Sequence, residues 1–182
     1  MKISIIGSGV VGSSIAFAIM DSTDIEMVDI DLEKARAECY DLRDAAQIQN
    51  LDTKISYSEH PGKADIYIIC VGKRIKESNY NGPVMENKEA VNKILSEIAN
   101  ENPDPWIFMV TNPSGEMAQE ALNIFRKVIS CGRSLDVSRT KVIGKHENPD
   151  ILNHYKEIKK GKGFTNWGCA AEVRMLIMGL HV

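Results

Sequence analysis

The sequence is poor in the residues that build metal knuckles and disulfide frameworks. It has only four cysteines in 182 residues, Cys39, Cys70, Cys131 and Cys169, and they lie far apart. No C-x-x-C pair occurs, and no histidine has the spacing that would complete a zinc site. We therefore expect no metal, and reduced, mostly buried thiols in a cytoplasmic protein.

The sequence also lacks an excess of charge of one sign. Its 22 Lys and Arg residues face 25 Asp and Glu residues, for a net charge of −3. This balance gives no basic surface for nucleic acid or for an anionic membrane. No later apolar run reaches the roughly 20 residues that span a bilayer. With 43% hydrophobic and 26% charged residues, the chain has the composition of a globular protein whose partners are small molecules.

The opening stretch MKISIIGSGVVGSSIAFAIM is the first informative segment. One interpretation is a secretory signal, because Lys2 precedes an apolar run and Ala16-Phe17-Ala18 resembles a signal-peptidase site. Three glycines within six residues interrupt that run, which favours a strand, a tight turn and a helix instead. The strand is expected over residues 2–6. The buried face of the helix is expected to carry Val11, Ile15, Ala18 and Ile19.

A second strand, Ile25–Ile30, places Asp29 seventeen residues after Gly12. In a G-x-G-x-x-G turn, Gly7 permits the turn, Gly9 lets the backbone approach a pyrophosphate, and Gly12 allows close packing of helix on strand. Asp29 can accept two hydrogen bonds from ribose hydroxyls, and its charge repels the extra phosphate of NADP. The pattern favours an NAD site; the alternative is a packing turn beside an empty crevice.

The rest of the chain alternates strands and helices as far as residue 130. Strands are expected over 54–57, 64–71, 106–110 and 128–130, and helices over 31–49, 85–100 and 115–127. This alternation predicts an α/β fold, a Rossmann-type doubly wound parallel sheet spanning residues 1–130. Ligands of such sheets bind at the carboxyl ends of the strands, where Asp29, Gly72 and Asn112 lie. Beyond Cys131 the pattern loses regularity.

At this point the sequence resembles the L-lactate/malate dehydrogenase family. The first 113 residues match almost continuously, and SLDVSR, VIGKH and KGFTNWG follow as islands in the family's order. The resemblance implies hydride transfer between nicotinamide and a small 2-hydroxy acid, with residues 131–182 as a short remnant of the substrate domain. The residues expected to form the cofactor site are Gly7, Gly9, Val10, Val11, Gly12, Asp29, Ile30, Val71, Gly72, Asn87, Val110 and Asn112.

The resemblance also implies roles for matching polar residues. His146 corresponds to the acid/base histidine, Asp136 would orient its imidazole, and Arg139 would clamp the substrate carboxylate. Asn112 would lie near nicotinamide and substrate, and Thr165 would line the substrate pocket. The alternatives are a solvated histidine, a surface ion pair of Asp136 with Arg139, and a helix-capping Thr165.

The loop after the fourth strand departs from the family pattern. The family carries two arginines there, whereas this chain has GKRIKESNYNGPVMEN. Arg74 matches the first arginine if one residue is deleted before it; otherwise Ile75 takes that position. Residues 80–82 (YNG) stand where the second belongs, and an uncharged side chain cannot replace a cation aimed at the developing oxyanion, which leaves Arg74 as the assisting cation. Lys73 and Lys76 make the loop basic, which favours a dicarboxylate, malate over lactate.

The chain is also short for the family. Only 47 residues, 136–182, remain for the substrate domain, and we expect them to pack on the nucleotide domain or on a second subunit. The helix over 31–49 matches the family's principal dimer interface, which predicts a homodimer or higher homo-oligomer. Two alternatives remain open: a non-catalytic NAD-binding relative, and, more distantly, an enzyme of different chemistry on the same fold, such as an NAD-dependent glycosidase.

Overall fold

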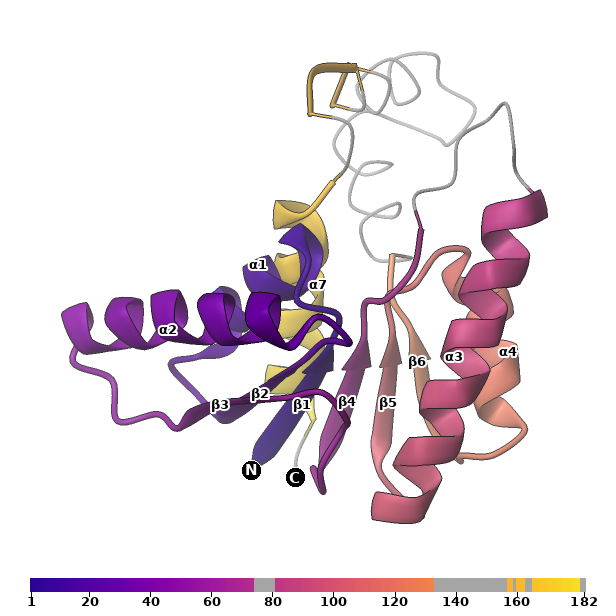
Figure 1. Ribbon diagram of the computed structural model, residues 1–182, viewed down its shortest axis with the longest axis horizontal. Helices are drawn as coiled ribbons and strands as arrows, with labels where there is room; N and C mark the ends of the chain where they lie inside the picture. Colours follow the sequence, from indigo (N-terminus) through magenta and orange to yellow (C-terminus); the bar gives the residue numbers. More distant parts are fainter. Residues whose placement is uncertain (74–80, 133–156, 159, 163–164, 181–182) are drawn as a thin grey trace.

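A six-stranded parallel sheet forms the centre of the protein (Figure 1). The computed structural model describes residues 1–73, 81–132, 157–158, 160–162 and 165–180. The strand order is β3-β2-β1-β4-β5-β6, so the order reverses between β1 and β4, as in a doubly wound Rossmann sheet. The predicted fold class is confirmed. The strands are β1 (Lys2–Ile6), β2 (Asp24–Val28), β3 (Ile55–Ser58), β4 (Ile66–Ile69), β5 (Trp106–Met109) and β6 (Lys127–Ser130).

Apolar residues on both faces make the central strands suited to a parallel sheet. Ile3 of β1 pairs with Ile25 of β2 on one side and with Ile66 of β4 on the other. All four residues of β4 are buried, because helices cover both faces of the sheet. Because helices cover both faces of the sheet, a ligand can approach it at the carboxyl ends of the strands.

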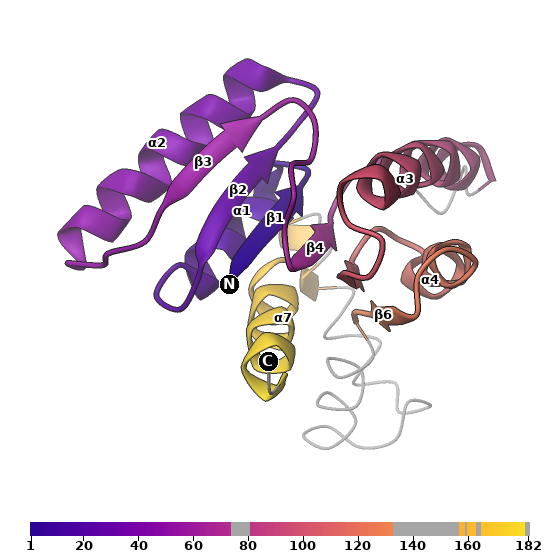
Figure 2. The same cartoon turned by 90° about the horizontal axis from the view of Figure 1, so that it is seen from below.

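Two layers of helices enclose the sheet (Figure 2). Helices α1 (Val10–Ile19), α2 (Leu32–Ile48) and α7 (Trp167–Gly179) share one apolar cluster with one face. Helices α3 (Asn81–Glu101) and α4 (Ser114–Leu122) share a second cluster with the opposite face. Among the described residues, no helix is both long enough and apolar enough to cross a membrane.

Helix α2 has the amphipathic pattern that its sequence predicts. It buries Ala35, Cys39, Leu42 and Ala46, which recur every three or four residues. Leu32 is at its first turn and remains 41% exposed. The Asp31 side chain caps the helix by accepting a hydrogen bond from the backbone N–H of Lys34 at 3.1 Å.

Several element boundaries differ from the sequence-based expectation; β4, for example, is Ile66–Ile69 rather than 64–71. β2 ends at Val28 and Ile30 is 88% exposed, because the chain turns at Asp29 so that Asp31 can cap α2. Helix α3 begins at residue 81 rather than 85. Helix α4 ends at Leu122 rather than 127, because the chain turns to bury Phe125 before β6 begins.

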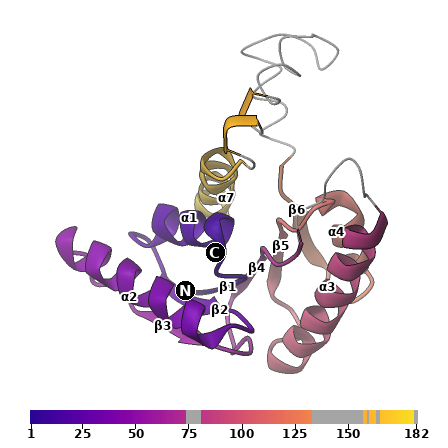
Figure 3. The same cartoon turned by 45° about the horizontal axis from the view of Figure 1, so that its top comes forward.

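The sequence pattern loses regularity beyond Cys131, but the last described segment is a regular helix. Helix α7 packs against α1 and buries Ala170, Val173 and Ile177 (Figure 3). Arg174 reinforces this contact: its guanidinium donates to both carboxylate oxygens of Asp21, at 2.6 and 2.8 Å, and also to the Ala18 carbonyl. The C-terminal segment therefore packs on the first βαβ unit. The domain boundary at residues 130/131 stays a prediction.

Candidate functional site

The turn between β1 and α1 is held by two glycines in close contact. Gly7 has a φ of +103°, a conformation that favours glycine, and donates its N–H to the Val28 carbonyl at 2.7 Å. A Cβ on Gly12 would lie 2.0 Å from the Gly7 carbonyl oxygen. Helix α1 therefore approaches the turn more closely than any side chain permits.

Gly9 serves a different purpose, because open space lies in front of it. The nearest atom to a Cβ placed there would be the Lys34 Nζ, 3.9 Å away. Gly9 is the N-cap of α1 and offers no side chain to the free N–H groups of the first turn. Free N–H groups and a partial positive charge at a helix start suit an anionic phosphate. Because Gly9 has no side chain, there is room for a phosphate at this place.

Asp29 lies at the carboxyl end of β2, opposite this turn. Its Oδ2 accepts hydrogen bonds from the Ser8 N–H at 2.9 Å and the Ser8 hydroxyl at 2.8 Å, and its Oδ1 accepts from the Asp31 N–H at 3.1 Å. Burial acts to raise the pKa of Asp29, but these hydrogen bonds and the Lys34 charge outweigh it, so the pKa lies below its ordinary value. Asp29 is a stable carboxylate at neutral pH.

The contacts of Asp29 qualify the role assigned to it from the sequence. Oδ2 also receives the Lys34 ammonium at 3.3 Å and so has three donors, whereas Oδ1 has one. A carboxylate oxygen accepts about two hydrogen bonds. Oδ1 is thus the oxygen with room for a ribose hydroxyl. Asp29 can accept hydrogen bonds from two ribose hydroxyls only if the side chain of Lys34 or of Ser8 turns away from Oδ2.

Asn87 of α3 connects the ends of β4 and β5. Its side chain is 2% exposed and accepts a hydrogen bond from the Lys73 N–H at 2.6 Å. It donates to the carbonyls of Lys73 at 3.2 Å and Asn112 at 3.0 Å. Gly72 makes this contact possible, because a Cβ there would lie 2.6 Å from the Asn87 Oδ1. Asn87 therefore positions the two loops; its direct contact with a cofactor stays a prediction.

The Thr111 hydroxyl makes a second link between the same strand ends. It donates to the Val71 carbonyl at 2.7 Å and contacts the Ile69 carbonyl at 3.2 Å. Asn112 follows it, exposed at the carboxyl end of β5 and joined to Pro113 by a cis peptide bond. The predicted cofactor residues on β1, β2, β4 and β5 thus converge on one edge of the sheet.

The predicted catalytic residues are not among those that the structure places. Arg74, Asp136, Arg139 and His146 lie outside the described residues. Thr165 is described: it is half-buried and immediately precedes Asn166, the N-cap of α7.

Asn166 is a site residue that the sequence-based reasoning missed. It is buried, and its amide donates to the Ser14 hydroxyl at 2.6 Å. Ser14 in turn donates to the Val10 carbonyl at 2.7 Å, in the first turn of α1. Thr165 is thereby held near the glycine turn. The KGFTNWG island contained this residue, but only the fold shows what its side chain contacts.

All four thiols lie on the α1, α2 and α7 side of the sheet. Cys39 and Cys131 belong to the apolar cluster of this layer, and Cys70 and Cys169 pack against it. All are free, and burial raises the pKa of Cys169 to about 12 and holds those of Cys70 and Cys131 well above their ordinary value. They are protonated apolar groups at neutral pH. No cluster of three or more potential metal ligands occurs in the part of the chain that the structure describes.

Comparisons with known proteins agree with this geometry. Residues 1–129 match the family model for the lactate/malate dehydrogenase NAD-binding domain. L-lactate dehydrogenase A from Rhizopus oryzae is 31% identical over 149 residues, 78% of this chain and 47% of the relative. An L-lactate dehydrogenase from Clostridium perfringens is 32% identical over 162 residues, 84% of this chain and 51% of the relative. The chain spans about half the length of these curated relatives.

Solved structures show the same fold at lower sequence identity. Malate dehydrogenase from Archaeoglobus fulgidus in complex with NADH superposes with a TM-score of 0.87 at 21% identity, covering 99% of this chain and 77% of that one. Malate dehydrogenase from Salinibacter ruber gives a TM-score of 0.80 at 19% identity, with coverage of 98% and 75%.

Proposed function

The chain belongs to the lactate/malate dehydrogenase family, with residues 1–129 as its NAD-binding domain, and we propose that it is an NAD-dependent dehydrogenase of small 2-hydroxy acids. The observation that carries the proposal is the glycine turn at the strand ends, with Asp29 beside it. Gly7 and Gly12 are required there by packing, whereas Gly9 faces open space beside the start of α1. This cradle fits a dinucleotide: phosphates at the start of α1 and a ribose at Asp29.

When bound, NAD supplies the hydride acceptor or donor at its nicotinamide ring. The residues of this chain bind and orient the reactants. We assign His146 the proton transfer to and from the substrate oxygen, with Asp136 orienting its imidazole. Arg139 would hold the substrate carboxylate through two parallel hydrogen bonds, with Arg74 as an assisting cation.

Asn112 and Thr165 complete the proposed substrate side of the site. Their described positions support this, because Asn112 is exposed at the end of β5 and Thr165 is held near the glycine turn through Asn166. Malate is favoured over lactate, since the loop after β4 carries three basic residues, Lys73, Arg74 and Lys76, that attract a second carboxylate. The four free cysteines support a reducing compartment, and we place the protein in the cytoplasm.

The test is calorimetric titration with NADH, followed by addition of oxaloacetate and then pyruvate while nicotinamide absorbance is recorded. NADH binding with oxidation on oxaloacetate is the expected result. The His146→Asn variant should bind NADH normally and lose turnover. The matched control is His60→Asn, because His60 is exposed and its imidazole pairs with Glu97 of α3. Full turnover by His146→Asn would remove it from the mechanism.

A second candidate is a non-catalytic NAD-binding relative. It is favoured by the sequence of the loop after β4, in which residues 80–82 stand where the family has its second arginine. NADH binding without oxidation of the cofactor by either acid, at any pH between 6 and 9, would support this candidate over the dehydrogenase.

We further propose that two copies associate through α2. This helix exposes Leu32, Tyr40 and Ile48, and Ile48 is 81% exposed. Apolar side chains on an outer helix face are typical of a protein interface. Ile48→Lys should shift the chain from dimer to monomer in light scattering. Leu122→Lys, at an exposed apolar residue of α4, is the control that should leave the mass unchanged.

A further inference from the structure

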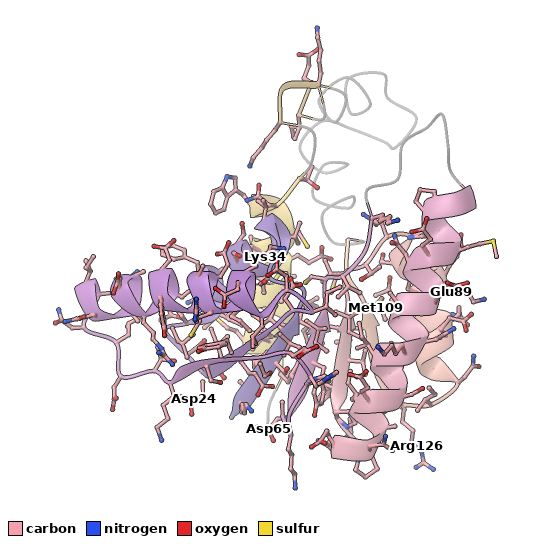
Figure 4. All side chains as sticks on the ribbon, in the orientation of Figure 1. Asp24, Lys34, Asp65, Glu89, Met109 and Arg126 are labelled. Carbon is pink, nitrogen blue, oxygen red and sulfur yellow. The ribbon has the colours of Figure 1, made fainter. Side chains whose placement is uncertain are left out.

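The Lys34 ammonium lies at the proposed cofactor site. Lys34 lies in the first turn of α2, and its Nζ is 3.3 Å from the Asp29 Oδ2. A Cβ on Gly9 would lie 3.9 Å from the same Nζ. The ammonium thus lies between the glycine turn and the acidic residue. Figure 4 shows Lys34 at the end of α2 that faces α1 and the strand ends.

The position of the Lys34 ammonium changes which nucleotides the Asp29 carboxylate can exclude. A lone carboxylate beside the ribose repels a 2′-phosphate, which is the physical basis for preferring NAD to NADP. Here the carboxylate charge is opposed by an ammonium in contact with it, and Oδ2 is further occupied by the two Ser8 donors. The net charge that faces an incoming ribose is therefore close to zero. Repulsion of a phosphate is correspondingly weak.

Lys34 can also contact a phosphate directly. Its side chain is 44% exposed, so the ion pair with Asp29 contributes little and opens at small cost. An ammonium has three N–H donors, of which Asp29 takes one. The backbone N–H of Lys34 is already committed to the cap at Asp31, so the first turn holds the Lys34 Cα in place while its side chain is free to swing.

We propose that Lys34 makes this site accept a 2′-phosphorylated dinucleotide, so that the chain binds NADPH as well as NADH and the Asp29–Lys34 pair sets the ratio of the two affinities. The inference rests on the proposed function, because it assumes that NADH binds at the glycine turn and Asp29. It deepens that function by assigning a specificity-determining residue outside the glycine turn.

The test is titration of the parent chain and of Lys34→Met with NADH and with NADPH by calorimetry. The parent should bind both. In Lys34→Met the ratio of the NADPH Kd to the NADH Kd should rise about tenfold, the loss expected for one charge-assisted hydrogen bond to phosphate. Lys34→Arg should keep the parent ratio. Lys93→Met, on the exposed side of α3, is the control that should change neither constant.

Three outcomes would overturn the proposal. If Lys34 contacts the pyrophosphate instead, Lys34→Met will weaken both nucleotides equally and the ratio will not change. If Asp29 alone controls the choice, the parent will bind NADH and reject NADPH. In both cases the proposed NADH site stands. Failure of the parent to bind NADH at all would overturn the proposed function together with this inference.

Discussion

Adding one methyl group at either of two glycines should separate folding from cofactor binding. Gly12→Ala and Gly9→Ala introduce the same atom three residues apart in one turn. At Gly12 the new Cβ would lie 2.0 Å from the Gly7 carbonyl oxygen, whereas ordinary contact begins at 3.4 Å. At Gly9 the nearest atom would be 3.9 Å away, at the end of the Lys34 side chain.

The two substitutions should differ in their effect on stability. Helix α1 would have to move about 1.4 Å from the turn to admit the methyl at Gly12, in an interior packed too densely to yield, so the cost is about 3 kcal/mol or more. Gly9 has extended φ and ψ angles of −79° and 179°, which alanine adopts. There the loss of a glycine N-cap and the reduced entropy of the unfolded chain nearly cancel, leaving a net effect within about 1 kcal/mol.

Gly9→Ala, the variant expected to stay stable, should be the one that loses affinity for NADH. Urea unfolding followed by tryptophan fluorescence gives the free energy of unfolding, and calorimetry gives the NADH Kd. Gly9→Ala should stay folded and bind NADH about tenfold or more weakly, equivalent to about 1.4 kcal/mol, because its methyl fills the space left for the phosphates. A Gly12→Ala variant as stable as the parent, or a Gly9→Ala variant with the parent's NADH affinity, would refute this account of the turn.

Three further predictions concern contacts outside the crevice, and urea unfolding measures each. Arg174→Met should cost about 1 kcal/mol, because it removes a partly exposed ion pair between α7 and α1. Asp21→Asn should lower the free energy of unfolding by about the same amount, and the double variant should lower it by less than the sum of the two single effects. Full additivity would show that the two side chains do not interact. Glu26→Gln should cost about 1–3 kcal/mol, since this buried carboxylate accepts from Lys2, the Ser4 hydroxyl and the Gly62 N–H; an unchanged stability would contradict it. Burial raises the pKa of Cys169 from 9.0 to about 12, so the folded state holds this proton more tightly than the unfolded state. This contribution to the free energy of unfolding is fully present below pH 9 and is lost as the pH rises toward 12. Cys169→Ala should therefore make the free energy of unfolding fall less steeply over this pH range. An equally steep fall in the variant would show that the Cys169 thiol is not its cause.

The sequence was sufficient to predict those features that depend on local pattern. The glycine spacing, the β-branched strands and the carboxylate of Asp29 each have a local physical cause, and the parallel sheet follows from their alternation. Boundaries were less accurate where a tertiary contact decides the turn. The burial of Phe125, for example, takes place after α4 has ended.

Helix α7 entered the sequence analysis only as an alternative, the helix that Thr165 would cap, because apolar residues occur all around it. Val173 and Ile177 are buried, yet Met175 and Met178 are exposed, so no polar stripe marks an outer face. Lys34 was missed for a different reason. In the sequence it is an ordinary charge on an outer helix face, and only the approach of α2 to the glycine turn brings its ammonium to Asp29.

The contact between α1 and α7 has a consequence for how the chain acquires its structure. The Asn166–Ser14 hydrogen bond joins residues 152 positions apart. During synthesis the sheet strands emerge first, and the side of α1 that α7 covers stays uncovered until α7 has been made. Closing so long a loop slows folding more than it weakens the final state, because its entropic cost grows only with the logarithm of length. A nascent or shortened chain ending at residue 130 would therefore display an apolar helix face to other chains, and we expect it to aggregate where a chain that includes α7 does not.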